Sequence, residues 1–237
     1  MLVKSAIKMM LHTVGLDLVR YVPEFERPFD ILTLIVEKHL ETQRPFYFVQ
    51  VGANDGIQDD PLRTLILRHK LRGLLVEPIP DIFEILCKNY AEAPQLQFAN
   101  VAISTSGAPL TMYRVQKDAL LPRFVHGLGS FEKYHLEKQG VPTNYIEEIS
   151  VRSVTLPTLL ANHRVREVTL LQVDTEGYDS VIVESSLECG ILPKIINYEH
   201  CHLSPTTRLR CKRLLDNYGY RFIEAGKDTL AVRTSVD

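Results

Sequence analysis

The chain has 237 residues, of which 45% are hydrophobic and 24% are charged. A chain of this length and composition can bury a sizeable core, which excludes a disordered or low-complexity protein. Its formal net charge of −2 argues against a generic nucleic-acid-binding protein, which usually carries an excess of basic residues.

The first predicted element is an amphipathic helix near the amino terminus. Apolar residues recur at helical spacing at Ile7, Leu11, Val14 and Leu18. The segment is basic and partly apolar, as a signal peptide is, but polar residues interrupt the apolar run and no small-residue cleavage motif follows. We interpret residues 1–42 as a helical extension that packs on the domain or on a second subunit, as in a homodimer. The alternative is a helix that docks on a partner or makes peripheral contact with a membrane surface.

From Phe46 onward, short apolar runs alternate with helical patterns. This alternation is typical of right-handed βαβ units and a mostly parallel α/β sheet. The predicted strands are 46–51, 73–77, 95–103, 168–174 and 194–200. Helices are predicted to begin at Asp60–Pro61, to span 81–90, and to run from Ser204 to Gly219.

The carboxyl end has a different pattern. The runs 220–225 and 229–233 are separated only by Gly226, Lys227 and Asp228. A loop this short joins antiparallel strands, so the sequence predicts a carboxyl-terminal hairpin and one reversed edge strand. A parallel sheet with a reversed strand favours a methyltransferase-type sheet over a plain dinucleotide-binding fold.

Residues 103–167 exceed what the alternation of strands and helices requires. They contain a further predicted strand at 109–115, a Gly-rich turn and a polar helix. Insertions at such places commonly carry substrate specificity. Its aromatic residues and histidines are therefore candidates for contact with a substrate, and these are His126, Tyr134 and His135.

The stretch "VGANDG" follows the first predicted strand directly. In open α/β sheets, ligands bind beyond the carboxyl ends of the strands. Gly52 and Gly56 allow a sharp turn and a close approach of the backbone to a ligand. The stretch lacks both the Lys-Ser/Thr of a phosphate loop and the dinucleotide spacing of glycines. Its Asn54 and Asp55 instead suit a ligand that carries positive charge or amine donors.

Two further polar residues lie at the next strands. Glu77 ends the second predicted strand, where an acidic side chain can accept both hydroxyl hydrogens of a ribose. Asn100 lies in the third predicted strand, and its amide suits the edge of an adenine. The "VGANDG" loop, Glu77 and Asn100 follow one another at the first three predicted strands, and together they predict an adenosine-containing ligand. The alternative is an ordinary turn with a capping carboxylate.

The chain resembles the FkbM family of S-adenosylmethionine-dependent methyltransferases. The resemblance rests on "VGANDG", "LLVEPIPDIFEILCKNY", "ANVAIS", "SVTLPTLLANH" and "LLQVDTEGYDSVIVES", in that order, over roughly residues 46–200. It implies a Rossmann-like seven-stranded methyltransferase sheet in a domain of residues 43–237, with S-adenosylmethionine as methyl donor. It also implies O-methylation, often of sugar hydroxyls on polysaccharides, glycolipids or secondary metabolites. The predicted donor site comprises Gly52, Asn54, Asp55, Gly56, Glu77 and Asn100.

The sequence departs from the family pattern at two positions. Related members commonly have Lys before the Asp of the "VDTEGYD" block, whereas Gln172 and Val173 precede Asp174 here. The later acidic position is Asp179 rather than Glu. Both departures leave the predicted donor site in place, but they leave the identity of the acceptor open.

The donor implied by the resemblance carries a sulfonium cation, which Asp55 and Asp174 can balance. A hydroxyl acceptor also needs a general base, and Asp174, Glu176, Glu199 and His200 lie at the ends of the fourth and fifth predicted strands. His200 is the base candidate with an intrinsic pKa near neutrality.

Other roles stay open for these residues. His200 is alternatively a structural hydrogen-bonding residue, and it can join Asp174 and Glu199 in holding a divalent cation, although no metal is predicted. Glu176 alternatively caps the following helix. Cys201 and His202 are interpreted as loop packing.

The function is open to two alternatives: N-methylation of a small amine or peptide, and a non-catalytic binding or scaffold protein of the same fold. The expected acceptor is a small molecule or saccharide rather than a nucleic acid. The chain has four scattered cysteines without a C-x-x-C pair, and no apolar run reaches the roughly 18 residues of a membrane span. We therefore expect a cytoplasmic protein, or one peripheral to the inner face of the membrane.

Overall fold

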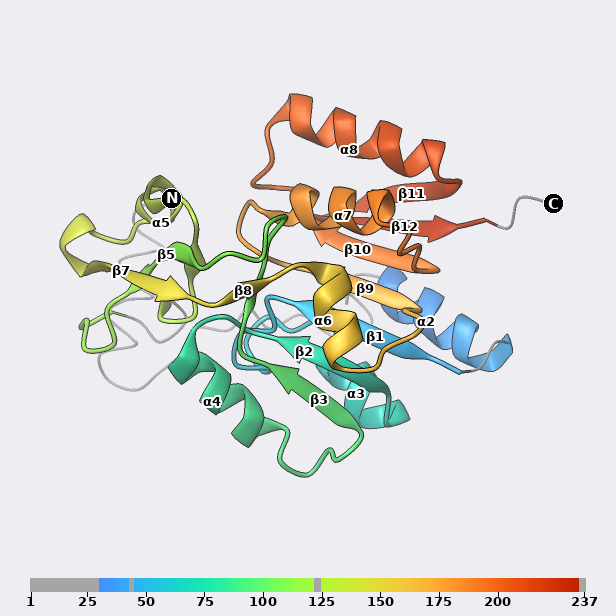
Figure 1. Ribbon diagram of the computed structural model, residues 1–237, viewed down its shortest axis with the longest axis horizontal. Helices are drawn as coiled ribbons and strands as arrows, with labels where there is room; N and C mark the ends of the chain where they lie inside the picture. The colour runs from blue at the N-terminus through green and yellow to red at the C-terminus, as the bar shows by residue number, and fades with distance from the viewer. Residues whose placement is uncertain (1–29, 43–44, 122–124, 235–237) are drawn as a thin grey trace, which may run out of the picture.

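A seven-stranded sheet forms the centre of the molecule, in the order β11-β12-β10-β9-β1-β2-β3 (Figure 1). The computed structural model describes residues 30–42, 45–121 and 125–234. Neighbouring strands are parallel from β10 to β3, and β12 runs antiparallel to both β10 and β11. The strands are β1 (Tyr47–Val51), β2 (Arg72–Val76), β3 (Leu96–Ala99), β9 (Leu170–Val173), β10 (Ile195–Glu199), β11 (Tyr220–Ala225) and β12 (Asp228–Arg233).

Helices cover both faces of this sheet, which explains why its parallel strands read as nearly continuous apolar runs. Side chains alternate along β1, so that Val49 packs in one core cluster and Phe48 in the other. The Val49 face is covered by α6 (Leu156–Asn162), α7 (Asp179–Glu188) and α8 (Pro205–Asn217). The Phe48 face is covered by α2 (Ile31–Thr42), α3 (Arg63–His69) and α4 (Pro80–Asn89).

The amphipathic helix predicted over Ile7 to Leu18 lies outside the described residues. The described part of the proposed extension is α2, whose Leu32 and Val36 are buried in the same cluster as Phe48. This part of the chain therefore packs on the domain. Among the described residues, no helix combines the length and the apolar character needed to span a membrane.

Two predicted helix starts have different outcomes. Ser204 is the N-cap of α8, and its hydroxyl accepts the Thr207 N–H at 3.1 Å, as its place before Pro205 predicts. The start at Asp60–Pro61 is wrong, because α3 begins only at Arg63. Asp60 instead accepts the Leu62 N–H and the Gln50 side-chain amide, which holds the preceding turn.

The predicted carboxyl-terminal hairpin is confirmed, since β11 and β12 pair antiparallel. The reversed strand does not lie at the edge, however. β12 pairs with β10 on its other side, and β11 forms the edge. In its inner place β12 buries Leu230 and Ala231, whereas β11 is exposed from Arg221 to Ala225.

The insertion folds as a small antiparallel unit beside the sheet. β5 (Leu110–Val115), predicted as a strand, pairs with β6 (Gly129–Ser130) and with β7 (Ile146–Val151). The third predicted strand is broken at Asn100, and its second part pairs with β8 (Ser153–Val154). The remaining elements are β4 (Ala102–Ile103), α5 (Lys133–Lys138) and the 3-10 turn η3 (Thr143–Tyr145). Figure 1 shows β5, β7 and α5 beyond the arrowheads of the parallel strands.

Candidate active site

A cavity lies between the carboxyl ends of the parallel strands and the insertion. The strand ends contribute Gly52, Glu77, Asp174 and Glu199 to its wall. The insertion contributes the apolar side chains of Met112, Leu128 and Phe131. The insertion therefore covers the edge of the sheet where an α/β fold binds its ligand.

Gly52 allows the ends of β1 and β9 to come together. Its φ is +81°, and a Cβ added there would lie 1.8 Å from the carbonyl oxygen of Asp174. Gly56 also has a positive φ of +72°, but its missing side chain makes room for Tyr90 and Leu86 of the α4 region. Gly52 lines the cavity and Gly56 does not. The second glycine serves the packing of the loop on α4.

The two polar residues of this loop have different positions. Asn54 lines the cavity, and its backbone N–H donates to Glu77 Oε2 at 3.0 Å. Asp55 is absent from the cavity wall because its carboxylate accepts the N–H groups of Ile57 and Gln58 at 2.9 and 2.8 Å. Asp55 therefore caps the turn, and the expectation that it balances a ligand cation is not supported.

Glu77 is buried at the cavity, with 5% of its surface exposed. Its carboxylate accepts the N–H groups of Asn54 and Ile79, and each oxygen keeps a further lone pair for a ligand hydroxyl. Burial raises the pKa of this carboxyl to about 7. Asn100 does not line the cavity, because its amide donates to the carbonyl oxygens of Glu77 and Pro78 at 2.8 and 3.1 Å. It holds the turn that carries Glu77.

Carboxylates gather where β9 and β10 end. Burial, followed by the negative charge of Glu199, raises the pKa of Asp174 to about 8. Both residues line the cavity, and Lys227 approaches Glu199 Oε1 at 3.6 Å from the hairpin turn. A negative charge that raises the pKa of a neighbouring carboxyl favours a cationic ligand beside both.

The two positions that depart from the family pattern are used inside the fold. Gln172 is buried in β9, where its Oε1 accepts the Asn197 amide at 2.9 Å. Asp179 is buried and accepts the N–H groups of Thr175 and Gly177, at 3.2 and 3.1 Å, so it stabilises the loop before α7. The N-cap residue of α7 is Tyr178, without a side-chain cap hydrogen bond, so the alternative that Glu176 caps this helix is not supported.

His200 faces away from the cavity. Glu199 directs its side chain to the cavity, and the next residue along a strand points to the opposite side. His200 is 5% exposed, and its Nδ1 lies 2.9 Å from Thr229 Oγ1 of β12. Burial lowers its pKa. The prediction that His200 lies at the mouth as a base is not supported, and its structural hydrogen bond agrees with the alternative interpretation.

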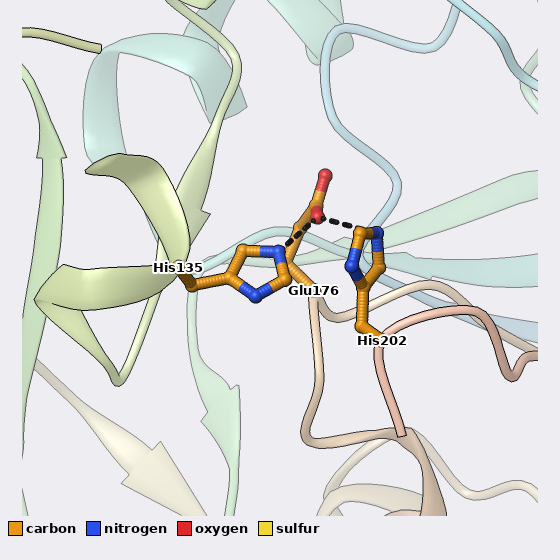
Figure 2. Close-up of side chains that lie close together, drawn as sticks. All are labelled: His135, Glu176 and His202. Carbon is orange, nitrogen blue, oxygen red and sulfur yellow. Dashed lines mark hydrogen bonds and ion pairs between the residues drawn. The ribbon is translucent and has the colours of Figure 1, made fainter. Parts of the chain in front are cut away.

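The histidines that do contact the acidic mouth are His135 and His202 (Figure 2). Glu176 Oε2 lies 2.8 Å from His135 Nε2 and 3.3 Å from His202 Nε2. His202 Nε2 also lies 3.1 Å from Glu199 Oε2, and the carboxylate of Glu199 raises the pKa of His202. His202, interpreted from the sequence as loop packing, therefore also contacts two carboxylates. The one sequence signal is its position three residues after Glu199, and nothing local connects it with His135.

Comparison with known proteins decides the family. Residues 50–222 match the model described as the methyltransferase FkbM domain, which is more than half of the chain. The chain belongs to the FkbM methyltransferase family. An FkbM methyltransferase is an enzyme, and methyltransferases of this fold generally use S-adenosylmethionine.

Solved structures similar to this FkbM chain are also methyltransferases. A METTL16 methyltransferase domain is 11% identical with a TM-score of 0.49, covering 95% of this chain and 76% of that one. The precorrin-6y C5,15-methyltransferase of Geobacter metallireducens is 9% identical with a TM-score of 0.44, covering 90% and 92%. The comparison with curated proteins gives no match.

The cavity has a donor set that fits S-adenosylmethionine. The buried Glu77 carboxylate suits the ribose hydroxyls, and the acidic ends of β9 and β10 suit the cationic methionine part. Three polar atoms of its wall are buried without a hydrogen-bond partner in the described part of the chain: Thr175 Oγ1, Gln50 Oε1 and Glu199 Oε2, the last of which has only its ion-pair contact with His202. Buried polar atoms are normally paired, so Thr175 Oγ1 and Gln50 Oε1 indicate a polar ligand.

Proposed function

We propose that this FkbM methyltransferase methylates a hydroxyl group of a saccharide, glycolipid or secondary metabolite. The observation that carries the proposal is that Glu77, Asp174 and Glu199 line one cavity under the insertion. Glu77 would bind the ribose of S-adenosylmethionine, while Asp174 and Glu199 would balance its positive charge. When bound, S-adenosylmethionine supplies an electrophilic methyl group.

The chain's own contribution is alignment and proton removal. Positioning of two reactants in one cavity lowers a barrier by about 7–11 kcal/mol in favourable cases. A hydroxyl must also lose its proton. Bound S-adenosylmethionine, being cationic, would favour the ionised form of Asp174, which could then act as general base. Asp174, already a candidate from the sequence, is therefore the proposed general base in place of His200.

The nature of the acceptor is supported by charge and shape. The net charge of −2 and the acidic mouth disfavour a nucleic acid, whose phosphates would be repelled. Met112, Leu128 and Phe131 give the insertion side of the cavity an apolar surface that suits the face of a sugar ring. An acceptor amine would be held by the same carboxylates as an ammonium ion, which has no free lone pair. Mass analysis of the methylated product distinguishes O- from N-methylation.

The proposal is tested by calorimetry with S-adenosylmethionine. Glu77→Gln removes a negative charge that accepts ribose hydroxyls, and hydrogen bonds to a charged acceptor contribute about 1.5–3 kcal/mol. We expect donor binding about 10- to 100-fold weaker than in the native chain. The matched control is Glu188→Gln, an exposed carboxylate at the end of α7, with unchanged affinity.

Absence of binding heat from the native chain at millimolar donor would instead support the scaffold alternative. Equal affinities of Glu77→Gln and the native chain would contradict the assignment of Glu77.

A further inference from the structure

Three segments that are far apart in the sequence bring His135, Glu176 and His202 together (Figure 2). His135 lies on α5 of the insertion, Glu176 lies in the loop between β9 and α7, and His202 follows β10. The ligand atoms of these three side chains lie within 4.8 Å of one another. Glu176 also lines the donor cavity, so the cluster adjoins the place where an acceptor would enter.

The spacing of these atoms matches that of ligands around one metal ion. Atoms that bind a transition metal at about 2.0–2.2 Å lie about 2.9–3.5 Å from one another in octahedral or tetrahedral geometry. Glu176 Oε2 lies 2.8 Å from His135 Nε2 and 3.3 Å from His202 Nε2. Glu199 Oε2 lies 3.1 Å from His202 Nε2 but does not belong to the group of His135, Glu176 and His202, so it contacts the cluster only through His202.

With Glu176 ionised, hydrogen bonding leaves one close contact of this cluster unsatisfied. Gln139 Nε2 lies 2.7 Å from Glu176 Oε2 and 2.9 Å from His135 Nε2, which are themselves 2.8 Å apart. If His135 Nε2 carries a proton for an ionised Glu176, it faces Gln139 Nε2 as donor against donor. If it carries none, its lone pair faces the carboxylate. Rotation of the Gln139 amide brings its oxygen against the carboxylate instead.

A cation accepts the lone pairs of the imidazole and the carboxylate together, and so removes this conflict. The backbone at Glu176 is consistent with a fixed position, because its φ of +53° lies in the left-handed region that side-chain-bearing residues rarely adopt. Such conformations are retained where the surroundings hold them, often at functional sites.

We propose that His135, Glu176 and His202 bind a divalent transition-metal ion. Two imidazole nitrogens with a carboxylate oxygen suit Zn²⁺ and its first-row neighbours, whereas Mg²⁺ prefers oxygen ligands alone. Three protein ligands leave a position for an acceptor oxygen, whose pKa the ion would lower. This acceptor role rests on the proposed function, whereas metal binding itself does not.

The test is calorimetric titration of the chelator-treated full chain with Zn²⁺ and, separately, Mg²⁺, without donor or acceptor. We expect one equivalent of Zn²⁺ to bind and Mg²⁺ to bind at least 100-fold more weakly. His135→Ala and His202→Ala each weaken Zn²⁺ binding by 10-fold or more. The matched control is His163→Ala, since His163 contacts Gln97 of β3 and belongs to no cluster of ligands in the described part of the chain.

Folding of the variants is checked by circular dichroism and by thermal unfolding in the absence of metal. Zn²⁺ should raise the unfolding midpoint of the native chain and of His163→Ala but not of His135→Ala. If an alanine variant does not fold, Glu176→Gln decides, because it keeps the size of the side chain and loses the charged ligand. No Zn²⁺ binding to the native chain, or equal binding by the cluster variants and the control, overturns the proposal.

Donor calorimetry with and without chelator separates this inference from the proposed function. Donor binding without Zn²⁺ binding would remove the metal site and retain the methyltransferase assignment of the cavity. Zn²⁺ binding without donor binding would retain the metal site and remove the assignment of the cavity as a donor site.

Discussion

Gly52 shows how one residue decides whether the ligand-binding edge of the sheet can form. Its Cα lies so close to β9 that an added Cβ would meet the Asp174 carbonyl oxygen at 1.8 Å, and the atom it would meet belongs to the backbone. Relief of that contact requires the ends of β1 and β9 to separate. Those two ends carry Asn54 and Asp174 into the cavity, so stability and ligand binding depend on the same contact.

We expect Gly52→Ala to lower the free energy of unfolding by about 3 kcal/mol or more, from the backbone clash and the positive φ together. The matched control is Gly140→Ala, whose φ is +91° but whose added Cβ would meet nothing within 4 Å. This control should lose only the about 1–2 kcal/mol of stability that a positive φ costs a residue with a Cβ. Urea unfolding of both variants measures the difference, and equal losses would show that the clash is relieved without cost.

At the scale of elements, Arg114 connects the insertion to the domain. It is buried in β5 with 2% of its surface exposed, and its guanidinium pairs with Asp81 of α4 through two hydrogen bonds. Glu147 of β7 lies 3.4 Å from its Nε. The insertion covers the cavity, so this ion pair fixes the position of the cover relative to the strand ends.

Asp81→Ala should destabilise the insertion by about 2–4 kcal/mol, because it leaves a buried guanidinium without its main partner. Limited proteolysis should then cleave residues 103–167 faster than in the native chain. The control is Lys117→Ala: Lys117 also lies 3.4 Å from Asp81, but it is 64% exposed, and exposed pairs contribute little. If both variants were cleaved at the native rate, the ion pair would have no role in holding the insertion.

The elements also show which information the sequence contained. β1, β2, β9 and β10 were predictable because helices cover both faces of these strands, which therefore read as apolar runs between turn residues. The inner position of β12 could not be predicted, because the short loop to β11 determines only that these two strands pair. Which of them meets β10 emerges only in the folded chain, where β12 buries Leu230 and Ala231.

The candidate site likewise contains residues that the sequence predicts and residues that only the folded chain brings together. Glu77, Asp174 and Glu199 could be predicted, because residues at the ends of parallel strands meet at one edge of the sheet. His135 could be placed only as a candidate substrate contact, since its position beside Glu176 depends on how the insertion folds back over the strands. His200 was preferred for its intrinsic pKa, although the alternation of side chains after Glu199 directs it away from the cavity.

At the scale of the whole molecule, the buried acids of the cavity give stability a dependence on pH. The pKa of Asp174 is raised to about 8 and that of Glu77 to about 7, with burial as the main cause in both. Both values exceed those of the unfolded chain, which are about 3.9 and 4.3. Between these limits the folded state holds more protons than the unfolded state, so stability falls as pH rises and stops falling above the folded pKa values. The ligand-binding site is thus maintained at a cost to the stability of the ligand-free fold.

Across pH 7 to pH 8.5 the histidines with lowered pKa values, such as His200, are already neutral, whereas His202, whose pKa is raised, changes stability in the same direction as the two acids. We expect the free energy of unfolding to fall by about 1–2 kcal/mol across this interval, which is roughly 3–6 °C in the unfolding midpoint. Asp174→Asn should remove most of this slope, whereas Asp118→Asn, at an exposed position of the insertion, should keep it. Thermal unfolding of the three proteins in metal-free buffer checks the expectation, and a native midpoint that stays constant or rises over the interval would contradict it. Because a cationic ligand prefers ionised Asp174, saturating S-adenosylmethionine should flatten the slope of the native chain as well.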